Sequence, residues 1–428
     1  GHNAKSFQFQ RTASGSWKIR CRCYVNPSNP QFYNVYGTTD YSAVWLVEHL
    51  INQTPIVAMK DGKDAAGKKV RVKDTEQTVI LQEKCELIAQ AFQDWIFSDP
   101  VREAEIVSQY NQTYNNYVVP QYDGSHLTFP GMTSRIELKP HQKNAVYRII
   151  RDNGALIGHV VGSGKTITLL AAGMELKRLG RISKPLYLVP NNLLAQWGGE
   201  MMRLYPTANI LLADPDDMRK QRRKRFLSRI ATGDYDAVFL GSSSFSKIPA
   251  PSQTVSSHLN WMGQKIFETK FPGRPMLQNP IESLPMFMQE DILKNYLANE
   301  QAEYNLEELG IDYLFVDESH EFKNLRNPSA RGSIRGLSNS TSAKCTDLYY
   351  KTKYLNALHH GKGGFTFATG TAIVNSITEL YSLQRYFQED LLFEKGITSL
   401  DSWISLFGNV TTEWELPPEG LNENGEGF

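Results

Sequence analysis

Residues 155–166 read ALIGHVVGSGKT, in which an apolar run, predicted to be a strand at 155–161, ends in a glycine-rich turn. A helical pattern begins directly after this turn and ends near Gly180. Glycines let backbone amides fold around phosphate groups, and a helix N-terminus adds its own unpaired amides and positive dipole. The order of strand, turn and helix therefore predicts a phosphate-binding site in a parallel α/β sheet.

Two side chains complete the predicted phosphate site. Lys165 is suited to neutralise the β and γ phosphates, and the Thr166 hydroxyl is suited to ligate magnesium. The longer G-x-x-x-x-G-K-T spacing is not met, because His159 stands where its first glycine would be. A chance Gly-Lys-Thr in a loop is the alternative interpretation, and the flanking strand and helix weigh against it.

Four further apolar runs follow, and helical patterns lie between them. Runs this compact are typical of strands that are buried on both faces of a parallel sheet. The sequence therefore predicts an α/β fold with a parallel, doubly wound sheet, whose ligands bind at the carboxyl ends of the strands. The additional strands are predicted at residues 185–189, 237–240, 313–316 and 365–368.

Residues 314–320, LFVDESH, deliver two adjacent carboxylates at a strand end. Asp317 is suited to hold magnesium directly or through water, and Glu318 to polarise an attacking water. His320 is predicted to face the interface where the nucleotide state is passed to a nucleic acid. Taken alone, a carboxylate pair after a strand is as often a solvated surface pair as a functional one. Its position after a phosphate turn favours a DExH box.

A glutamine lies upstream of the phosphate turn, in residues 138–142, LKPHQ. The Gln142 amide can act as donor and acceptor toward adenine, although a surface glutamine at a helix start is the alternative. The predicted catalytic residues are Lys165, Asp317, Glu318 and His320; the predicted nucleotide-binding residues are Gln142, Gly162, Ser163, Gly164, Lys165 and Thr166; the predicted magnesium ligands are Thr166 and Asp317.

Other strand ends carry residues that suit a nucleic-acid track. Residues 189–197, VPNNLLAQW, start a helix whose open amides and Asn N-cap suit a phosphate, whereas Trp197 is predicted to be core. Residues 367–372, FATGTA, form a small hydroxyl-rich turn that suits coupling between the two sites. The predicted coupling or DNA-binding residues are Pro190, Asn191, Asn192, Ser242, Thr369, Gly370 and Thr371.

Two segments keep an open role. Residues 219–225, RKQRRKR, precede Phe226, Leu227 and Ile230 in a helical pattern. This basic run is either a phosphate-binding face, whose affinity would fall steeply with salt, or a solvated helix face. A mostly helical insertion spans about residues 248–306, and the sequence does not decide what it contacts.

The length of 428 residues predicts two domains, since domains usually hold roughly 100–200 residues. We expect an accessory α+β domain with its connection at 1–130 and the larger domain at 131–428. In the first, residues 17–25 alternate as a strand does, and residues 76–95 have a helical apolar face that includes Leu87 and Phe92. The net charge is only +1, so a polyanionic partner requires a local basic face.

Composition also bears on location. No run approaches the ~18 apolar residues that span a bilayer, and the N-terminus has no apolar signal region. Cys21 and Cys23 form a C-x-C pair and not the C-x-x-C knuckle of a zinc site. A cytoplasmic protein with unpaired thiols and no membrane partner is expected.

In order, the segments HQ, GSGKT, VPNNLLAQW, DESH and ATGTA resemble the Snf2-like branch of superfamily 2 helicases and translocases. Residues 122–132, 307–318 and 414–420 are similar to large helicase–N6-adenine methyltransferase proteins of phages and mobile elements, which include antirestriction proteins. The resemblance covers about residues 110–420.

This resemblance implies the first RecA-like lobe of a motor that uses ATP and Mg²⁺ on double-stranded DNA. A second RecA-like lobe and a methyltransferase module would belong to the same protein. No Asp/Asn-Pro-Pro-Tyr/Phe methylase motif occurs in the sequence, and no Arg-rich second-lobe motif follows Thr371. Ser319 replaces the usual Ala of DEAH, and Ala372 replaces the usual Pro after Gly-Thr.

The leading hypothesis is an enzyme that hydrolyses ATP to move on duplex DNA, in the service of DNA modification or antirestriction. This chain alone is expected to be weakly active, because the second lobe would supply an arginine worth roughly 10³–10⁵ in rate. One alternative is a non-hydrolysing, nucleotide-responsive DNA-binding or scaffold module. Another is a P-loop ATPase unrelated to DNA, against which VPNNLLAQW and ATGTA weigh.

Overall fold

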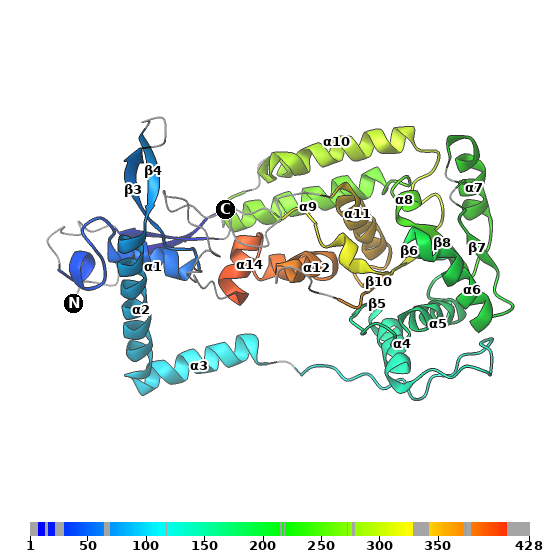
Figure 1. Cartoon of the computed structure of the whole chain (residues 1–428), viewed down its shortest axis with the longest axis horizontal. Coiled ribbons are helices and arrows are strands. Elements are labelled where there is room, and N and C mark those ends of the chain that lie inside the picture. Colours follow the sequence, from blue (N-terminus) through cyan, green and yellow to red (C-terminus); the bar gives the residue numbers. More distant parts are fainter. Residues whose placement is uncertain are drawn as a thin grey trace, which may run out of the picture. The chain divides into compact units, whose positions relative to one another are not determined.

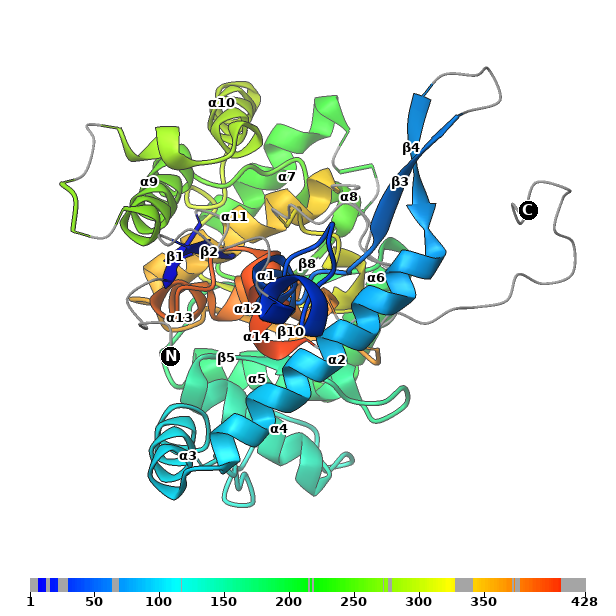
Figure 2. The same ribbon diagram turned by 90° about the vertical axis from the view of Figure 1, so that its left-hand side faces the viewer.

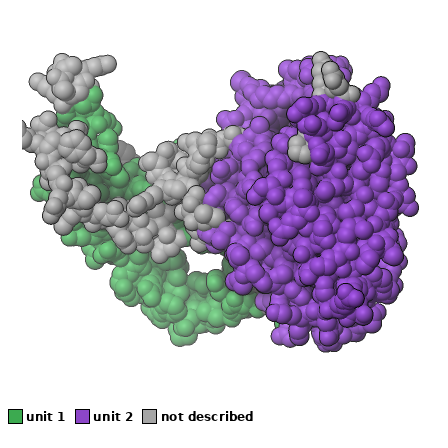
Figure 3. Space-filling model, turned by 45° about the vertical axis from the view of Figure 1, so that its right-hand side comes forward, with its two compact units in different colours: residues 1–118, 401–428 green, residues 119–400 purple. Residues whose placement is uncertain are grey.

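The computed structural model contains two compact units, residues 1–118 with 401–428 and residues 119–400, which Figure 3 distinguishes by colour. The residues whose structure is described are 7–12, 16–21, 30–63, 69–116, 118–214, 216–217, 219–271, 273–275, 279–327, 342–371, 373 and 378–408.

The larger unit is built on one six-stranded sheet in the order β5-β10-β9-β6-β8-β7. Figure 1 labels β5, β10, β6, β8 and β7 among the helices of this unit. Every neighbouring pair in it is parallel. The strand that leads to the phosphate turn, β5, is therefore separated from the strand that delivers the carboxylates, β9, by β10 alone. The strands are β5 (Gly154–Ile157), β6 (Pro185–Val189), β7 (Ile210–Leu212), β8 (Ala237–Gly241), β9 (Tyr313–Val316) and β10 (Phe365–Ala368).

Alternate side chains of the strands enter two different cores. Along β9, Leu314 and Val316 join one core while Tyr313 and Phe315 join the other. The same alternation holds in β6 and β8. Because successive side chains of a strand point to opposite faces, an uninterrupted apolar run is what a strand covered on both faces requires.

Helices cover both faces. Residues of α4, α5 and α6 pack in the core that contains Tyr313, and residues of α7 to α13 pack in the core that contains Leu314. The helices are α4 (Pro140–Asp152), α5 (Lys165–Arg178), η3 (Asn191–Leu193), α6 (Leu194–Leu204), α7 (Lys220–Thr232), α8 (Ser242–Phe245), α9 (Ser252–Lys270), η4 (Pro280–Ser283), α10 (Met286–Gln301), η5 (Ser319–Phe322), α11 (Ala343–Leu358), α12 (Glu379–Phe387) and α13 (Glu389–Glu394).

The smaller unit combines two antiparallel ribbons with helices (Figure 2). Its core is small and gathers around Leu46, Leu81 and Cys85. The part of helix α14 from Asp401 on belongs to this unit, where the Ser405 hydroxyl donates to the Asn52 carbonyl at 3.1 Å. Its elements are β1 (Phe7–Arg11), β2 (Trp17–Cys21), η2 (Gln31–Val35), α1 (Ala43–Ile51), β3 (Ala58–Lys63), β4 (Lys69–Asp74), α2 (Thr75–Phe97), α3 (Pro100–Tyr114) and α14 (Leu400–Phe407).

The predicted fold class, a parallel doubly wound sheet preceded by a smaller α+β domain, is confirmed, and its RecA-like type stays a prediction. Two details differ. Strand β5 ends at Ile157 and not at residue 161, because the chain leaves the sheet at Gly158 to form the turn. On α2, Leu87 and Phe92 are exposed, since only the N-terminal part of this helix reaches the small core.

No helix in the described part of the chain is both long and apolar enough to cross a membrane. The buried thiols of Cys85 and Cys345 are unpaired, and burial raises the pKa of Cys85 to about 11. Cys23 lies outside the described residues.

Candidate active site

The phosphate turn lies between β5 and α5 and depends on two glycines in left-handed conformation. Gly162 has φ 81° and Gly164 has φ 82°, values that side chains with a Cβ rarely adopt. A Cβ at position 164 would also lie 2.3 Å from Nε2 of Gln142. Gly164 is the N-cap of α5, so the first amides of that helix border the turn.

Lys165 connects this turn to the end of β10. Its Nζ donates to the His159 carbonyl at 3.2 Å. A Cβ on Gly370 would lie 3.6 Å from the same Nζ. The ammonium group therefore lies between the phosphate turn and the turn that contains Thr369 and Thr371. Thr166 lies half-buried in the first turn of α5.

Gln142 is buried and braces the phosphate turn against α4. Its Nε2 donates to the Ser163 carbonyl at 2.9 Å, and its Oε1 accepts from the Lys139 amide at 2.8 Å. His141 Nε2 lies 3.1 Å from the same Ser163 carbonyl. The amide of Gln142 thus faces protein backbone here, and its role in reading adenine stays a prediction.

Asp317 and Glu318 follow β9 directly. Asp317 is only 8% exposed, and its amide donates to the Leu188 carbonyl at 2.9 Å. Burial raises the pKa of this carboxyl, with a further rise from Glu318, against Lys165 and a hydrogen bond from Trp197, which lower it. Trp197 is core, as predicted. Glu318 has φ 48° and a partly exposed side chain.

His320 links the carboxylate pair to the β10 turn. Its Nδ1 lies 3.1 Å from Glu318 Oε2 and 3.2 Å from Thr369 Oγ1. Thr369 Oγ1 in turn accepts from the Thr371 amide at 3.0 Å. A movement of the Glu318 side chain can therefore be transmitted to the turn at residues 369–371 through the His320 imidazole. Ala372 lies outside the described residues.

The predicted track residues lie at the carboxyl ends of β6 and β8. Pro190 precedes η3, and Asn191 and Asn192 are exposed on it. The expectation that an asparagine caps the helix is wrong: α6 begins after Leu193, and no side chain caps it. Asn191 Oδ1 instead accepts from the Ser243 hydroxyl at 3.3 Å, which joins the ends of the two strands next to Ser242.

A hollow of about 300 Å³ opens beside the phosphate turn, lined by Tyr122, His141, Arg148 and His159 among others. Arg148 lies over the Tyr122 ring, with its guanidinium carbon 5.4 Å from the ring centre. Burial, His141 and Lys165 lower the pKa of His159. Sequence reasoning did not identify Tyr122 as a site residue, because it lies in an extended segment with no strand or helix signal of its own.

Gly124 lets the extended segment that contains Tyr122 pack directly against α4. A Cβ there would lie 2.1 Å from the Lys143 carbonyl oxygen, and the Gly124 amide donates to Asn144 Oδ1 at 2.8 Å. The extended segment can approach the helix this closely only without a side chain. Tyr122, two residues earlier in the chain, lines the hollow.

Family models match most of the chain. A family described as a probable helicase domain matches residues 147–271 and 274–420, and a family described as a domain of unknown function matches residues 5–116. Among curated relatives, defense against restriction protein B of Escherichia phage P1 is 23% identical over 393 residues. That alignment covers 81% of this chain and 17% of the phage protein, so the chain spans a small part of this relative.

Two solved structures from Sulfolobus solfataricus are also similar. The SWI2/SNF2 ATPase core in complex with dsDNA has 15% identity and a TM-score of 0.36 over 66% of this chain and 41% of its own. The SWI2/SNF2 ATPase core domain has 15% identity and a TM-score of 0.34 over 67% of this chain and 42% of its own.

Proposed function

The chain belongs to the probable helicase domain family, and we propose that its larger unit is the first lobe of an ATP-driven motor that moves on double-stranded DNA. The observation that carries this proposal is that three turns of the site meet at one edge of the sheet. The phosphate turn after β5, the carboxylates after β9 and the threonine turn after β10 meet at the carboxyl edge of three adjacent strands. Such an edge is where parallel sheets bind ligands.

The residues present fit a magnesium–nucleotide complex. Mg²⁺ prefers oxygen ligands and is commonly held by one or two carboxylates together with substrate phosphates, and Thr166 and Asp317 offer a hydroxyl and a carboxylate. When bound, the ion would neutralise charge that develops on the phosphates. Lys165 and the amides of Gly162, Ser163 and Gly164 would hold the phosphates at the N-terminus of α5.

Glu318 is the group that we assign to the attacking water. Its side chain is partly exposed beside Asp317, and His320 holds one of its oxygens at 3.1 Å. A base fixed in this way can take a proton from water, and Gln142 keeps the phosphate turn in register with it. His320 and Thr369 would then report the loss of the γ phosphate to the track.

The hollow beside Tyr122 is the proposed place of the base. Aromatic rings stack on nucleobases, and Arg148 beside the ring adds a second planar surface. Gln142 lies in the first turn of α4 and donates a hydrogen bond to the Ser163 carbonyl of the phosphate turn. This arrangement suits adenine, which the sequence predicted as the ligand.

The wider biological role rests on the relatives. The phage relative is named for defence against restriction, and we propose that this motor serves a DNA-protecting protein that also carries a second RecA-like lobe and a methyltransferase module. The second lobe would supply the arginine that stabilises the transition state, a contribution of roughly 10³–10⁵ in rate. A nucleotide-responsive DNA-binding module that never hydrolyses ATP is the competing proposal.

Nucleotide binding and turnover test this proposal. Lys165→Ala should abolish binding of a fluorescent ATP analogue with Mg²⁺ by this chain. In a protein extended through the following lobe, Glu318→Gln should keep nucleotide binding and lower DNA-stimulated turnover roughly 10²–10⁴-fold.

A matched control is Glu321→Gln, an exposed carboxylate on the same short helix that pairs with Lys344 at 2.9 Å. Its turnover should stay near that of the unmodified protein. If the extended protein binds ATP but turns over none with any duplex, the motor proposal fails and the non-hydrolysing module takes its place.

A further inference from the structure

The ribbon formed by β3 and β4 projects from the smaller unit. Figure 1 and Figure 2 both show it extending from the start of α2, beyond α1. Its root is anchored, because the Ala58 amide donates to the Thr78 hydroxyl at 3.0 Å and Asp74 caps α2. Beyond this root both faces carry exposed side chains, Val72 on one and Met59 on the other. A two-stranded ribbon is marginally stable in water by itself, so we expect this one to lie against a partner.

The charge of the β3–β4 ribbon favours a polyanionic partner. Residues 58–74 contain six Lys or Arg and three Asp, a net charge of +3, whereas the whole chain has +1. Arg71 and Lys73 are exposed, and neither forms an ion pair with any residue that the structure describes. The described ion pair of the ribbon joins Lys60 to Asp74 at 3.6 Å. The local basic face that a polyanion requires is therefore present here.

The basic run at residues 219–225 differs from the ribbon in this respect. Arg219 pairs with Asp216 at 2.8 Å, and Arg223 pairs with Glu303 at 2.6 Å. The helix that contains most of this run, α7, also packs its apolar side chains into the core of the larger unit. The run therefore presents less unmatched charge than its sequence indicates.

We propose that the β3–β4 ribbon binds double-stranded DNA by lying in the major groove. The two strands of a ribbon lie about 4.8 Å apart, and the major groove, about 12 Å wide, admits such a ribbon. Each strand has 6 residues and extends about 20 Å, which matches roughly six base-pair steps. The major groove of duplex RNA is deep and narrow, so the geometry favours DNA.

The face that carries Arg71 and Lys73 is suited to meet the DNA. Successive side chains of a strand alternate between faces, so these two lie on one face, about 7 Å apart along β4. Their cross-strand neighbours on the same face are Asp61 and Met59. Arg and Lys bind phosphates or guanine edges, and a carboxylate can accept from the amino group of cytosine. Met59 adds an apolar contact.

The inference concerns the smaller unit and goes beyond the motor function that we propose for the larger one. It would give a role to residues 5–116, which match a family of unknown function. The competing explanation is protective, since cations on exposed strands keep sheet edges from pairing with other chains. That role requires the charges but no nucleic acid.

The salt dependence of DNA binding by the whole chain tests the proposal. The double variant Arg71→Gln, Lys73→Gln should lower the slope of log affinity against log salt by roughly two, because each lost phosphate contact removes about one unit. Binding of the fluorescent ATP analogue should not change, because both residues lie outside the larger unit. Thermal melting should also be unchanged, because both side chains are exposed.

The matched control is the double variant Lys18→Gln, Arg20→Gln. It removes the same two residue types at the same spacing from β2, where both side chains are exposed. This strand lies against α1, and its Ile19 amide donates to Glu48 at 2.9 Å. The control should lower the slope clearly less than the ribbon variant. Equal decreases would mean that DNA senses the charge of the whole unit and not the ribbon, which would overturn the proposal.

Crosslinking and chemical protection test the groove itself. A photo-crosslinking residue in place of Met59 should crosslink to duplex DNA, and the bound protein should protect guanine N7, which lies in the major groove, from methylation. Crosslinking that duplex RNA displaces as readily as DNA does, or unprotected N7 atoms, would contradict binding in the groove.

An unchanged salt slope in the ribbon variant would support the protective role instead. This inference would then fail while the motor proposal stands, because DNA-stimulated turnover tests that proposal separately.

Discussion

The fold disfavours the ionised form of the Asp317 carboxyl. It lies at the end of β9, and burial raises the pKa of its carboxyl above the ordinary value of 3.8. An acid with a raised pKa in the folded state binds more protons when folded than when unfolded in the window above 3.8. Stability therefore falls as pH rises through that window, and the ionised carboxylate is a cost at neutral pH.

Asp317→Asn should accordingly raise the thermal midpoint of the nucleotide-free chain at pH 7 and flatten its decrease between about pH 4 and 7. The same change should weaken Mg²⁺-dependent nucleotide binding by about tenfold or more, because an amide is a poorer magnesium ligand than a carboxylate. Melting curves and titrations with and without Mg²⁺ measure both effects. A lower midpoint in the variant would contradict the assignment of burial as the main cause of the pKa shift.

At this scale the sequence predicted the polar residues well, because strand-end spacing brings Lys165, Asp317 and Glu318 together in any parallel sheet of this order. It missed contacts made by residues outside the motifs. The position of Tyr122 depends on packing that no local pattern encodes. It also did not predict that the side-chain amide of Gln142 is hydrogen-bonded to backbone groups.

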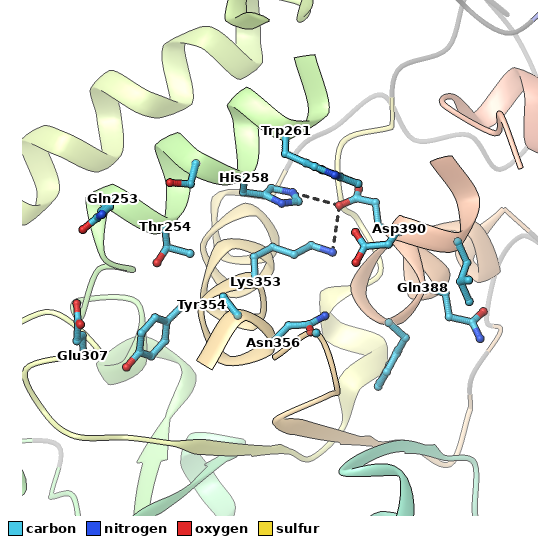
Figure 4. A pocket seen from close by; sticks show the side chains of 16 residues that line it. Gln253, Thr254, His258, Trp261, Glu307, Lys353, Tyr354, Asn356, Gln388 and Asp390 are labelled. Atoms are coloured by element: carbon cyan, nitrogen blue, oxygen red, sulfur yellow. Dashed lines mark ion pairs between the residues drawn. The ribbon is translucent and has the colours of Figure 1, made fainter. Parts of the chain in front are cut away.

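Among the helices, α9 is fixed to α11 and α13 by a buried charge cluster (Figure 4). Glu389 is buried, and its carboxylate pairs with Lys353 at 3.0 Å, with Arg385 at 3.0 Å and with His258 of α9 at 3.2 Å. The Tyr349 hydroxyl also donates to it. Two buried cations therefore depend on one carboxylate.

Glu389→Ala should destabilise the larger unit by about 3–5 kcal/mol, the usual cost of leaving buried charge without its partner. The midpoint of urea unfolding measures this. Asp390→Ala is the matched control, because Asp390 follows Glu389 in α13 but is exposed, and it should change the free energy of unfolding by less than about 0.5 kcal/mol. Equal effects of the two variants would mean that the cluster contributes no more than the surface.

The sequence could not predict this cluster. His258, Lys353 and Glu389 are far apart in the sequence, and each sits in a pattern that is equally typical of a solvated helix face. Local periodicity predicts which side of a helix is apolar, but it carries no information on which charged residues will share a burial site. Strand β7 was missed for a related reason, because three residues are too few to show a period.

For the whole molecule, the candidate site lies within one unit. The described groups that form it run from Tyr122 to Thr371, all between Val119 and Leu400. Composition predicted two domains with a boundary near residue 130, which stays a prediction. Composition gave no hint that residues 401–428 are grouped with the first 118, because membership of a discontinuous unit depends on long-range contacts.

A fragment of residues 119–400 should therefore fold and bind the fluorescent ATP analogue within about twofold of the whole chain, since distant groups contribute nearly independently. Its two cores, one on each face of the sheet, contain the buried apolar residues that the sheet requires. The fragment and the whole chain would be compared by nucleotide titration and by thermal melting, with Lys165→Ala in both as the control for specific binding. A fragment that melts cooperatively but has lost nucleotide affinity would show that residues outside 119–400 complete the site, and the assignment of the site to one unit would then be wrong.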